Sequence, residues 1–310
     1  MTQTSVCFRE SSGGNRGCQQ LVKVGIVQIF DGTEGRGVDH VREFAQHVEH
    51  CGFDSLWVPD HVVFFDNYQS KYPHTDDGAI QFKANQGILE PAMTLLEAAL
   101  VTERIRLGTS VEIVTERHPV IRAKELATLD LVSRGRVEYG IGVGWSVEEY
   151  AALGISFDDR GKRCDEWILA MRELWSSKRS NFSGDFVSFQ SAIFFPKPTS
   201  GRIPIVIGGN SPTALTRVAK LGDGWHGWKL TLDEVAEKLA EINVKLVKFG
   251  RTRDQVKLNV GLPFKGDLRD LAEYRDRLAK LGIDEMVVAM GMSRTKFKEQ
   301  ISDLATALGI

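Results

Sequence analysis

Two residues that could exchange a proton stand next to each other at the end of an apolar segment. The segment is LWVPDHVVFF, residues 56–65, and it contains Asp60 followed by His61. Burying a carboxylate or an imidazole is costly unless another group pairs with it. An unperturbed imidazole titrates at about pH 6.5, so His61 could donate or accept a proton in a cell. Asp60 could orient His61 or bind a ligand; the alternative reading is a helix-capping aspartate beside a packed histidine.

A second group of residues could bind an anion. An apolar run ends in Gly208 and Gly209, and Asn210, Ser211 and a proline follow. Ser211 suits the N-cap of a helix and the proline suits its first turn, while the glycines allow close backbone approach. The N-terminus of a helix attracts anions, above all phosphate. An ordinary strand–helix turn with a good cap would explain the same residues.

A third pattern is GIGVGW, in which Gly140, Gly142 and Gly144 alternate and Trp145 follows. Alternate residues of a strand point to one side, so Gly142 and Gly144 could leave a flat floor for a cofactor ring. Tight packing inside a barrel is the alternative. No cysteine or histidine spacing indicates a metal site, and no G-x-S-x-G elbow is present. These patterns suit a phosphorylated aromatic cofactor better than a metal or a covalent nucleophile.

The elements that must position these residues alternate along the chain. Short apolar runs rich in β-branched residues are each followed by an amphipathic run, which predicts parallel strands covered by helices. Eight such units most simply close into a (β/α)8 TIM barrel, with an insertion at 145–202 between strands four and five. An open doubly wound sheet is less favoured, since no G-x-G-x-x-G turn follows the first strand. The predicted strands are 23–30, 55–60, 106–114, 136–144, 203–209, 224–228, 256–262 and 284–290.

Composition limits the class of protein. The polar, Gly/Ser-rich residues 1–22 predict a flexible tail, and residues 23–310 predict one barrel domain. The net charge of −2 lacks the basic signature of nucleic-acid binders. No apolar run approaches the roughly 20 residues of a membrane helix. The four cysteines form no disulfide framework, so we expect a reducing, cytoplasmic location.

Several segments, in order, resemble the luciferase-like monooxygenase superfamily of flavin and deazaflavin oxidoreductases. The resemblance runs from Lys23 to the last helix. It is carried by SLWVPDH, EPAMTLLEAALVTERIRLGTSV, RHPVIRAKELATLDLVSRGRVEYGIGVGW, EEYAALGISFDDRGKRCDEW and PIVIGGNSPTALTRVAKLGDGW. GVGW followed by an EExxxLG segment is most similar to the branch that depends on coenzyme F420.

The resemblance implies roles for particular residues. His61 would donate or accept the proton at the deazaflavin ring, and Asp60 would contact the ring system. Ser110 and Val111 match a position where relatives hold a non-proline cis peptide beneath the ring. The segment that binds the cofactor phosphate in relatives matches Gly208, Gly209, Asn210 and Ser211.

The expected activity is hydride transfer between coenzyme F420 and a small organic substrate. Similar sugar-phosphate dehydrogenases have a glutamate where this chain has Trp145, so Trp145 predicts a pocket for an apolar or aromatic substrate. The alternative is a two-component monooxygenase that uses reduced FMN and O2; a third is a barrel that binds ligand without catalysis. The resemblance also implies a homodimer and a separate flavin or F420 reductase.

Overall fold

The computed structural model of the chain describes residues 21–30, 37–80 and 87–310. The predicted tail lies outside the described residues except for its last two positions. Of these, Leu21 is exposed, whereas Val22 is buried and its carbonyl accepts hydrogen bonds from Arg275. The packed chain therefore includes Val22, one residue before the predicted boundary.

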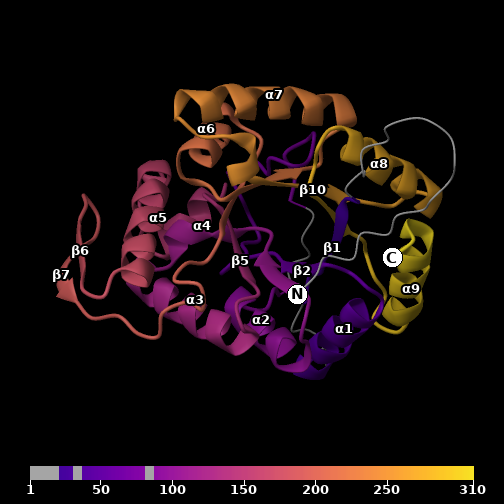
Figure 1. Ribbon diagram of the computed structural model, residues 1–310, viewed down its shortest axis with the longest axis horizontal. Coiled ribbons are helices and arrows are strands. Elements are labelled where there is room, and N and C mark those ends of the chain that lie inside the picture. Colours follow the sequence, from indigo (N-terminus) through magenta and orange to yellow (C-terminus); the bar gives the residue numbers. More distant parts are fainter. Residues whose placement is uncertain (1–20, 31–36, 81–86) are drawn as a thin grey trace, which may run out of the picture.

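Eight parallel strands close into a barrel, as the sequence predicted (Figure 1). Neighbours around the barrel are β1, β2, β3, β5, β8, β9, β10 and β11, and β11 pairs with β1 to complete the ring. The barrel strands are β1 (Lys23–Val27), β2 (Ser55–Val58), β3 (Arg106–Thr109), β5 (Val137–Gly142), β8 (Ile205–Gly208), β9 (Gly224–Trp228), β10 (Lys257–Pro263) and β11 (Glu285–Ala289).

Helices surround the strands in Figure 1 and cover the outside of the barrel. Each buries an apolar face; in α1, for example, Val41, Phe44 and Val48 are buried. Among the described residues, no helix has the length and apolarity needed to cross a membrane. The helices are α1 (Val38–His50), α2 (Pro91–Val101), α3 (Pro119–Ser133), α4 (Val147–Ala152), α5 (Arg160–Ser176), α6 (Pro212–Leu221), α7 (Leu232–Lys248), α8 (Leu268–Lys280) and α9 (Phe297–Leu308), with 3-10 turns η1 (Val114–Glu116) and η2 (Arg253–Gln255).

Two segments differ from the sequence expectation. The predicted strand 106–114 is divided, because the cis peptide Ser110–Val111 separates β3 from the short β4 (Glu112–Ile113). The segment 186–195, which the sequence left open between strand and loop, contains β7 (Ser188–Ala192). β7 pairs antiparallel with β6 (Ser180–Ser183), and this hairpin projects away from the barrel in Figure 1. The hairpin belongs to the insertion predicted between the fourth and fifth barrel strands.

Candidate functional site

Asp60 is anchored at the end of β2, where the strands open at the C-terminal mouth of the barrel. Its two carboxylate oxygens accept bidentate hydrogen bonds from Arg117, at 2.7 and 2.9 Å, and Oδ2 also accepts from the Ile113 N–H at 3.1 Å. Burial raises the pKa of Asp60, and the guanidinium of Arg117 opposes that rise. Asp60 thus fastens the start of the loop after β2 to β4; its predicted contact with the cofactor stays a prediction.

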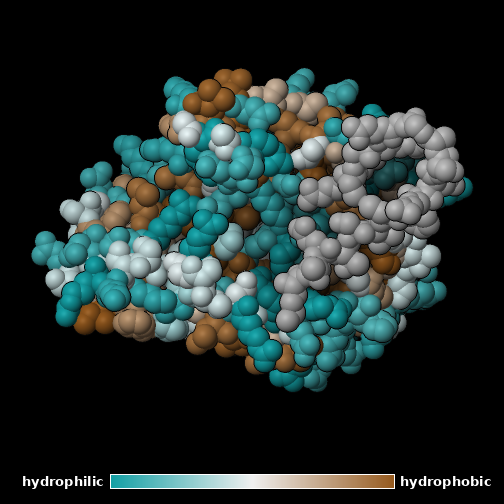
Figure 2. Space-filling model, in the orientation of Figure 1, coloured by the Kyte–Doolittle hydropathy of each residue, from teal (hydrophilic) through white to brown (hydrophobic). Residues whose placement is uncertain are grey.

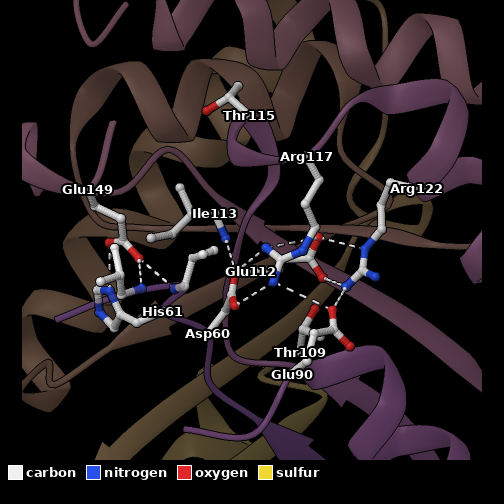
Figure 3. A network of polar contacts seen from close by, with 12 residues as sticks. Asp60, His61, Glu90, Thr109, Glu112, Ile113, Thr115, Arg117, Arg122 and Glu149 are labelled. Carbon is white, nitrogen blue, oxygen red and sulfur yellow. Dashed lines mark hydrogen bonds and ion pairs between the residues drawn. The ribbon is translucent and has the colours of Figure 1, made fainter. Parts of the chain in front are cut away.

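The ion pair of Asp60 and Arg117 belongs to a larger network (Figure 3). Glu112 lies 4.0 Å from Arg117 and is bound by Arg122 and by the Tyr139 hydroxyl, the latter at 2.6 Å. Arg122 and Glu112 are both fully buried. Each charge offsets the cost of removing the other from water, so neither would be tolerated there alone. The network therefore links Asp60, at the end of β2, to Arg122 of α3.

His61 is held by Glu149 rather than oriented by Asp60, which corrects one reading of the Asp60–His61 pair. The Nδ1 of His61 lies 2.9 Å from Glu149 Oε2, and the Glu149 side chain is fully buried (Figure 3). Glu149 Oε1 also accepts from the N–H groups of Val62 and Val63, at 2.6 and 3.3 Å. Because a carboxylate can only accept, Nδ1 is the donor, and proton exchange with a ligand falls to Nε2.

Glu149 is in place because α4 begins just before it. Ser146 is the N-cap of α4, and its hydroxyl accepts from the Glu149 N–H at 3.0 Å. Sequence analysis did not single out Glu149 as a site residue, although it is the second glutamate of the EExxxLG segment. The motif that contains Glu149 was therefore visible in the sequence. Nothing in the sequence indicated that Glu149 contacts His61, which lies 88 residues earlier.

Glu116 is a second acid that sequence analysis missed. It is buried, and within the described part of the chain neither side-chain oxygen has a hydrogen-bond partner. Burial, followed by the charges of Glu149 and Asp60, raises the pKa of Glu116 to about 9. The side chain is therefore a neutral carboxylic acid at pH 7.

Aromatic rings gather around His61. Its imidazole lies 5.1 Å from the ring of Phe64 and 5.7 Å from that of Trp145, measured between centroids. Tyr68 and Tyr72, on the loop that follows β2, each lie 5.3 Å from Trp145. All of these rings are only half-buried. Trp145, the predicted substrate contact, therefore lies beside His61 in an aromatic surface at the mouth.

The alternating glycines receive protein side chains instead of leaving an open floor. A Cβ atom at Gly142 would lie 2.8 Å from Cγ2 of Val111, and one at Gly208 would lie 2.7 Å from Cγ1 of Val111. At Gly144, where φ is +66°, a Cβ would meet Ile113 at 2.9 Å. These distances correct the bare-floor interpretation and support tight packing. They also show that three of the predicted site residues are in contact, because the side chain of Val111 packs against Gly142 and Gly208. Val111 follows the cis peptide bond that the resemblance predicted.

The turn after β8 is fixed from inside. Asn210 uses both ends of its side-chain amide on the Trp228 backbone, donating to the carbonyl at 2.8 Å and accepting from the N–H at 3.2 Å. Ser211 caps α6 by accepting from the Ala214 N–H at 3.2 Å, and Gly209 has a φ of +110° that suits only glycine. The backbone of this turn and the N-terminus of α6 remain suited to a phosphate, whereas the Asn210 side chain is already engaged. No group of three potential metal ligands occurs in the residues described here.

Comparisons with known proteins agree with this geometry. Residues 23–301 match the family model described as luciferase-like monooxygenase. An uncharacterised protein of Mycobacterium tuberculosis is 31% identical over 261 residues, 83% of this chain and 89% of the relative. An F420-dependent glucose-6-phosphate dehydrogenase of Amycolatopsis mediterranei is 32% identical over 209 residues, 64% of this chain and 57% of that protein. The crystal structure of the long-chain alkane monooxygenase LadA shares the fold, with a TM-score of 0.76, 14% identity, and coverage of 94% of this chain and 91% of LadA.

Proposed function

Because the chain belongs to the luciferase-like monooxygenase family, we propose that it is a coenzyme F420-dependent oxidoreductase acting on a small apolar or aromatic substrate. The observation that carries the proposal is the buried Glu149, which holds the imidazole of His61 at the barrel mouth. Relatives named as F420-dependent support the choice of cofactor. Hydride transfer is accompanied by a proton, and His61 is the group placed to carry it.

Residues at the mouth fit a phosphorylated, ring-bearing cofactor. The side chain of Val111, seated on Gly142 and Gly208, gives an apolar support for a ring, and Ser110 lies beside it in the chain. The turn at Gly209 and the N-terminus of α6 give backbone donors for a phosphate. When bound there, a deazaflavin would supply two-electron hydride chemistry. The protein's own contribution would be to support the ring on Val111 and to fix His61 through Glu149.

The loop after β2, together with Trp145 after β5, would supply the substrate contacts. Trp145, Tyr68, Tyr72 and Phe64 present half-buried rings on the side of His61. Such rings bind apolar or aromatic groups and offer no cation to a sugar phosphate. The substrate class proposed here therefore differs from the glucose 6-phosphate in the name of the Amycolatopsis relative.

A second candidate is an FMN-dependent two-component monooxygenase. The structural likeness to LadA, named as an alkane monooxygenase, favours it, since the aromatic surface would suit an alkane equally well. The same turn at Gly209 would bind the FMN phosphate, and His61 would again handle the proton.

A binding titration tests the two candidates. Purified protein is titrated with coenzyme F420 and with FMN, each oxidised and reduced, and tryptophan quenching reports affinity. We expect micromolar or tighter binding of F420 and weak binding of FMN. Preference for reduced FMN would replace the proposal with the monooxygenase; failure of both cofactors to bind would reject both.

We further propose that two copies form a homodimer and that a separate reductase supplies reduced cofactor in the cytoplasm. Apolar atoms appear along the lower edge of Figure 2, where α2 and α3 lie in Figure 1. Large apolar side chains are exposed on these two helices, including Leu100 and Ile121 at 61% each. An uncovered apolar face of this kind commonly marks an interface. Light scattering at micromolar concentration measures the mass; a monomer would contradict the dimer.

A further inference from the structure

Three side chains form a row inside the barrel, below the mouth. His226 on β9 is the register partner of Asn259 on β10, and Asn259 is the register partner of Glu285 on β11. Registered residues of neighbouring parallel strands point to the same side of the sheet. His226 and Asn259 are almost completely buried, with exposed fractions of 2% and 0%. The barrel interior therefore contains a row of polar side chains on three neighbouring strands.

The imidazole of His226 is fixed in place by aromatic rings. It stacks on Trp57 at 5.4 Å and on Trp228 at 6.1 Å between centroids, with interplanar angles of 27° in both cases. Gly261 makes room for this arrangement, since a Cβ there would lie 2.5 Å from Trp228 and 3.0 Å from Nε2 of His226. The two indole rings therefore fix the plane of the imidazole, and its Nε2 lies on the side of Gly261.

One nitrogen of His226 reaches the segment beneath the proposed cofactor ring. Nε2 lies 3.0 Å from the Ser110 hydroxyl oxygen, and Ser110 directly precedes Val111. The other nitrogen, Nδ1, has no hydrogen-bond partner among the described residues, and neither has the Oδ1 or the Nδ2 of Asn259. Leaving a buried polar group unpaired costs about 1–3 kcal/mol, so these atoms are expected to share a partner. A buried water with such polar neighbours is the usual solution.

We propose that a buried water joins Nδ1 of His226 to the amide of Asn259, and that Nε2 of His226 accepts a hydrogen bond from Ser110. In this arrangement the proton of the neutral imidazole is on Nδ1, and Nδ1 donates to the buried water. The Ser110 hydroxyl then points into the barrel, and its oxygen keeps a lone pair for a donor on the bound ligand. His226 is thus a positioning residue that acts through Ser110; this last part rests on the proposed function.

Nuclear magnetic resonance of the full chain without cofactor tests the tautomer. The protein is labelled with 15N-histidine, and the His226 signals are assigned with Ser110→Ala, which perturbs Nε2, and with His226→Phe, which removes both signals. At pH 7 we expect a neutral ring protonated on Nδ1, and we expect Asn259→Leu to shift Nδ1 while the fold is retained. A ring protonated on Nε2, an imidazolium, or an Nδ1 signal indifferent to Asn259→Leu would overturn the inference.

A double-mutant cycle tests the action through Ser110. Ser110→Ala and His226→Phe are each expected to weaken affinity for F420 by about tenfold, the value of one hydrogen bond. The double variant should bind F420 no more weakly than the weaker-binding single variant. Additive losses of binding free energy would show that His226 does not act through Ser110. Ser188→Ala, on the hairpin, is the matched control and should leave affinity unchanged. If the unaltered protein binds neither F420 nor FMN, the proposed function fails, while the tautomer is still decided by the resonance measurement.

Discussion

Two networks of buried charges in this barrel have different organisations. In the interior, Arg106 and Lys257 each contact both Glu138 and Glu285, at 2.6 to 3.0 Å, so that two cations and two anions close a ring. At the mouth, acids are in excess: Arg117 and Arg122 bind Asp60 and Glu112, and Glu149 separately binds His61. Every charge of the interior ring is balanced, which suits a structural element, whereas the mouth retains groups that can exchange protons.

The pKa values follow the same division. Burial opposes ionisation of Glu285, but Lys257 and Arg106 prevail and lower its pKa to about 2. At the mouth, Glu116 has no such partner among the described residues, and its pKa rises to about 9. Acids with strongly perturbed pKa values are typical of functional sites, whereas compensated ion pairs are typical of structural networks. The comparison therefore predicts that changes in the two networks affect different properties.

The largest effect is expected from opening the interior ring. Glu285→Gln would leave Lys257 and Arg106 facing too little negative charge, and we expect a loss of about 3–5 kcal/mol in the free energy of unfolding. Denaturant unfolding measures it. Glu138→Gln, whose side chain is 11% exposed, should cost less, because water can compensate the charges there. Equal losses of unfolding free energy in the two variants would show that the exposure of Glu138 makes no difference to its contribution.

The next effect is expected at His61 and concerns turnover. His61→Ala removes the proposed proton carrier, so turnover should fall by at least about 100-fold while cofactor affinity stays within a small factor. Steady-state kinetics with the bound cofactor and an apolar or aromatic substrate that the parent protein turns over measures this loss. His50→Ala, exposed on α1, is the control. Unchanged turnover would remove His61 from the mechanism and make the mouth network structural.

Glu116 should make the stability of the protein depend on pH, unlike the charge-balanced interior ring. Its folded-state pKa is raised from 4.5 to about 9, so the folded protein binds the proton more tightly than the unfolded chain. Stability from this group is complete below about pH 4.5 and is lost as the pH rises toward 9. Glu116→Gln should therefore be more stable than the parent by about 1–3 kcal/mol at pH 7.5 and equal to it near pH 4. Unfolding curves at both pH values check this, with the exposed Glu273→Gln as control.

A smaller effect is expected at Glu149. Glu149→Gln keeps the size of the side chain and an oxygen for Val62 but removes the charge beside His61. An imidazolium formed on His61 then lacks its charged partner, so we expect turnover to drop by about tenfold. Steady-state kinetics of the parent and the variant measure the loss. Equal turnover in the two proteins would mean that Glu149 only anchors the loop.

The smallest effect concerns the proposed phosphate site. Ser211→Asp keeps a good N-cap residue but adds a negative charge at the N-terminus of α6, so cofactor binding should weaken a few-fold, by about 0.3–1 kcal/mol. Ser211→Asn keeps the cap without the charge and should bind normally. Affinity from the titration separates the two. Identical affinities of the two variants would mean that this turn is an ordinary capped helix start and does not bind the cofactor phosphate.

Local patterns of the sequence determined much of the architecture. Apolar runs alternating with amphipathic runs predicted the barrel strands and their helices, since these periodicities depend on neighbours within a few residues. Ser211 followed by proline predicted the start of α6, and His61 was placed at a strand end, where barrel sites are built. The family resemblance added the cis peptide at Ser110–Val111.

Only the tertiary structure decided which partners these residues have. Glu149 reaches His61 across 88 residues, Arg117 reaches Asp60 across 57, and Val111 fills the space beside Gly142 and Gly208. The glycine pattern was compatible with an open floor or with packing, because a sequence shows a missing side chain but not what occupies its place. Such contacts exist once the sheet has closed and brought distant strand ends together, and closure is a property of the whole barrel rather than of any segment.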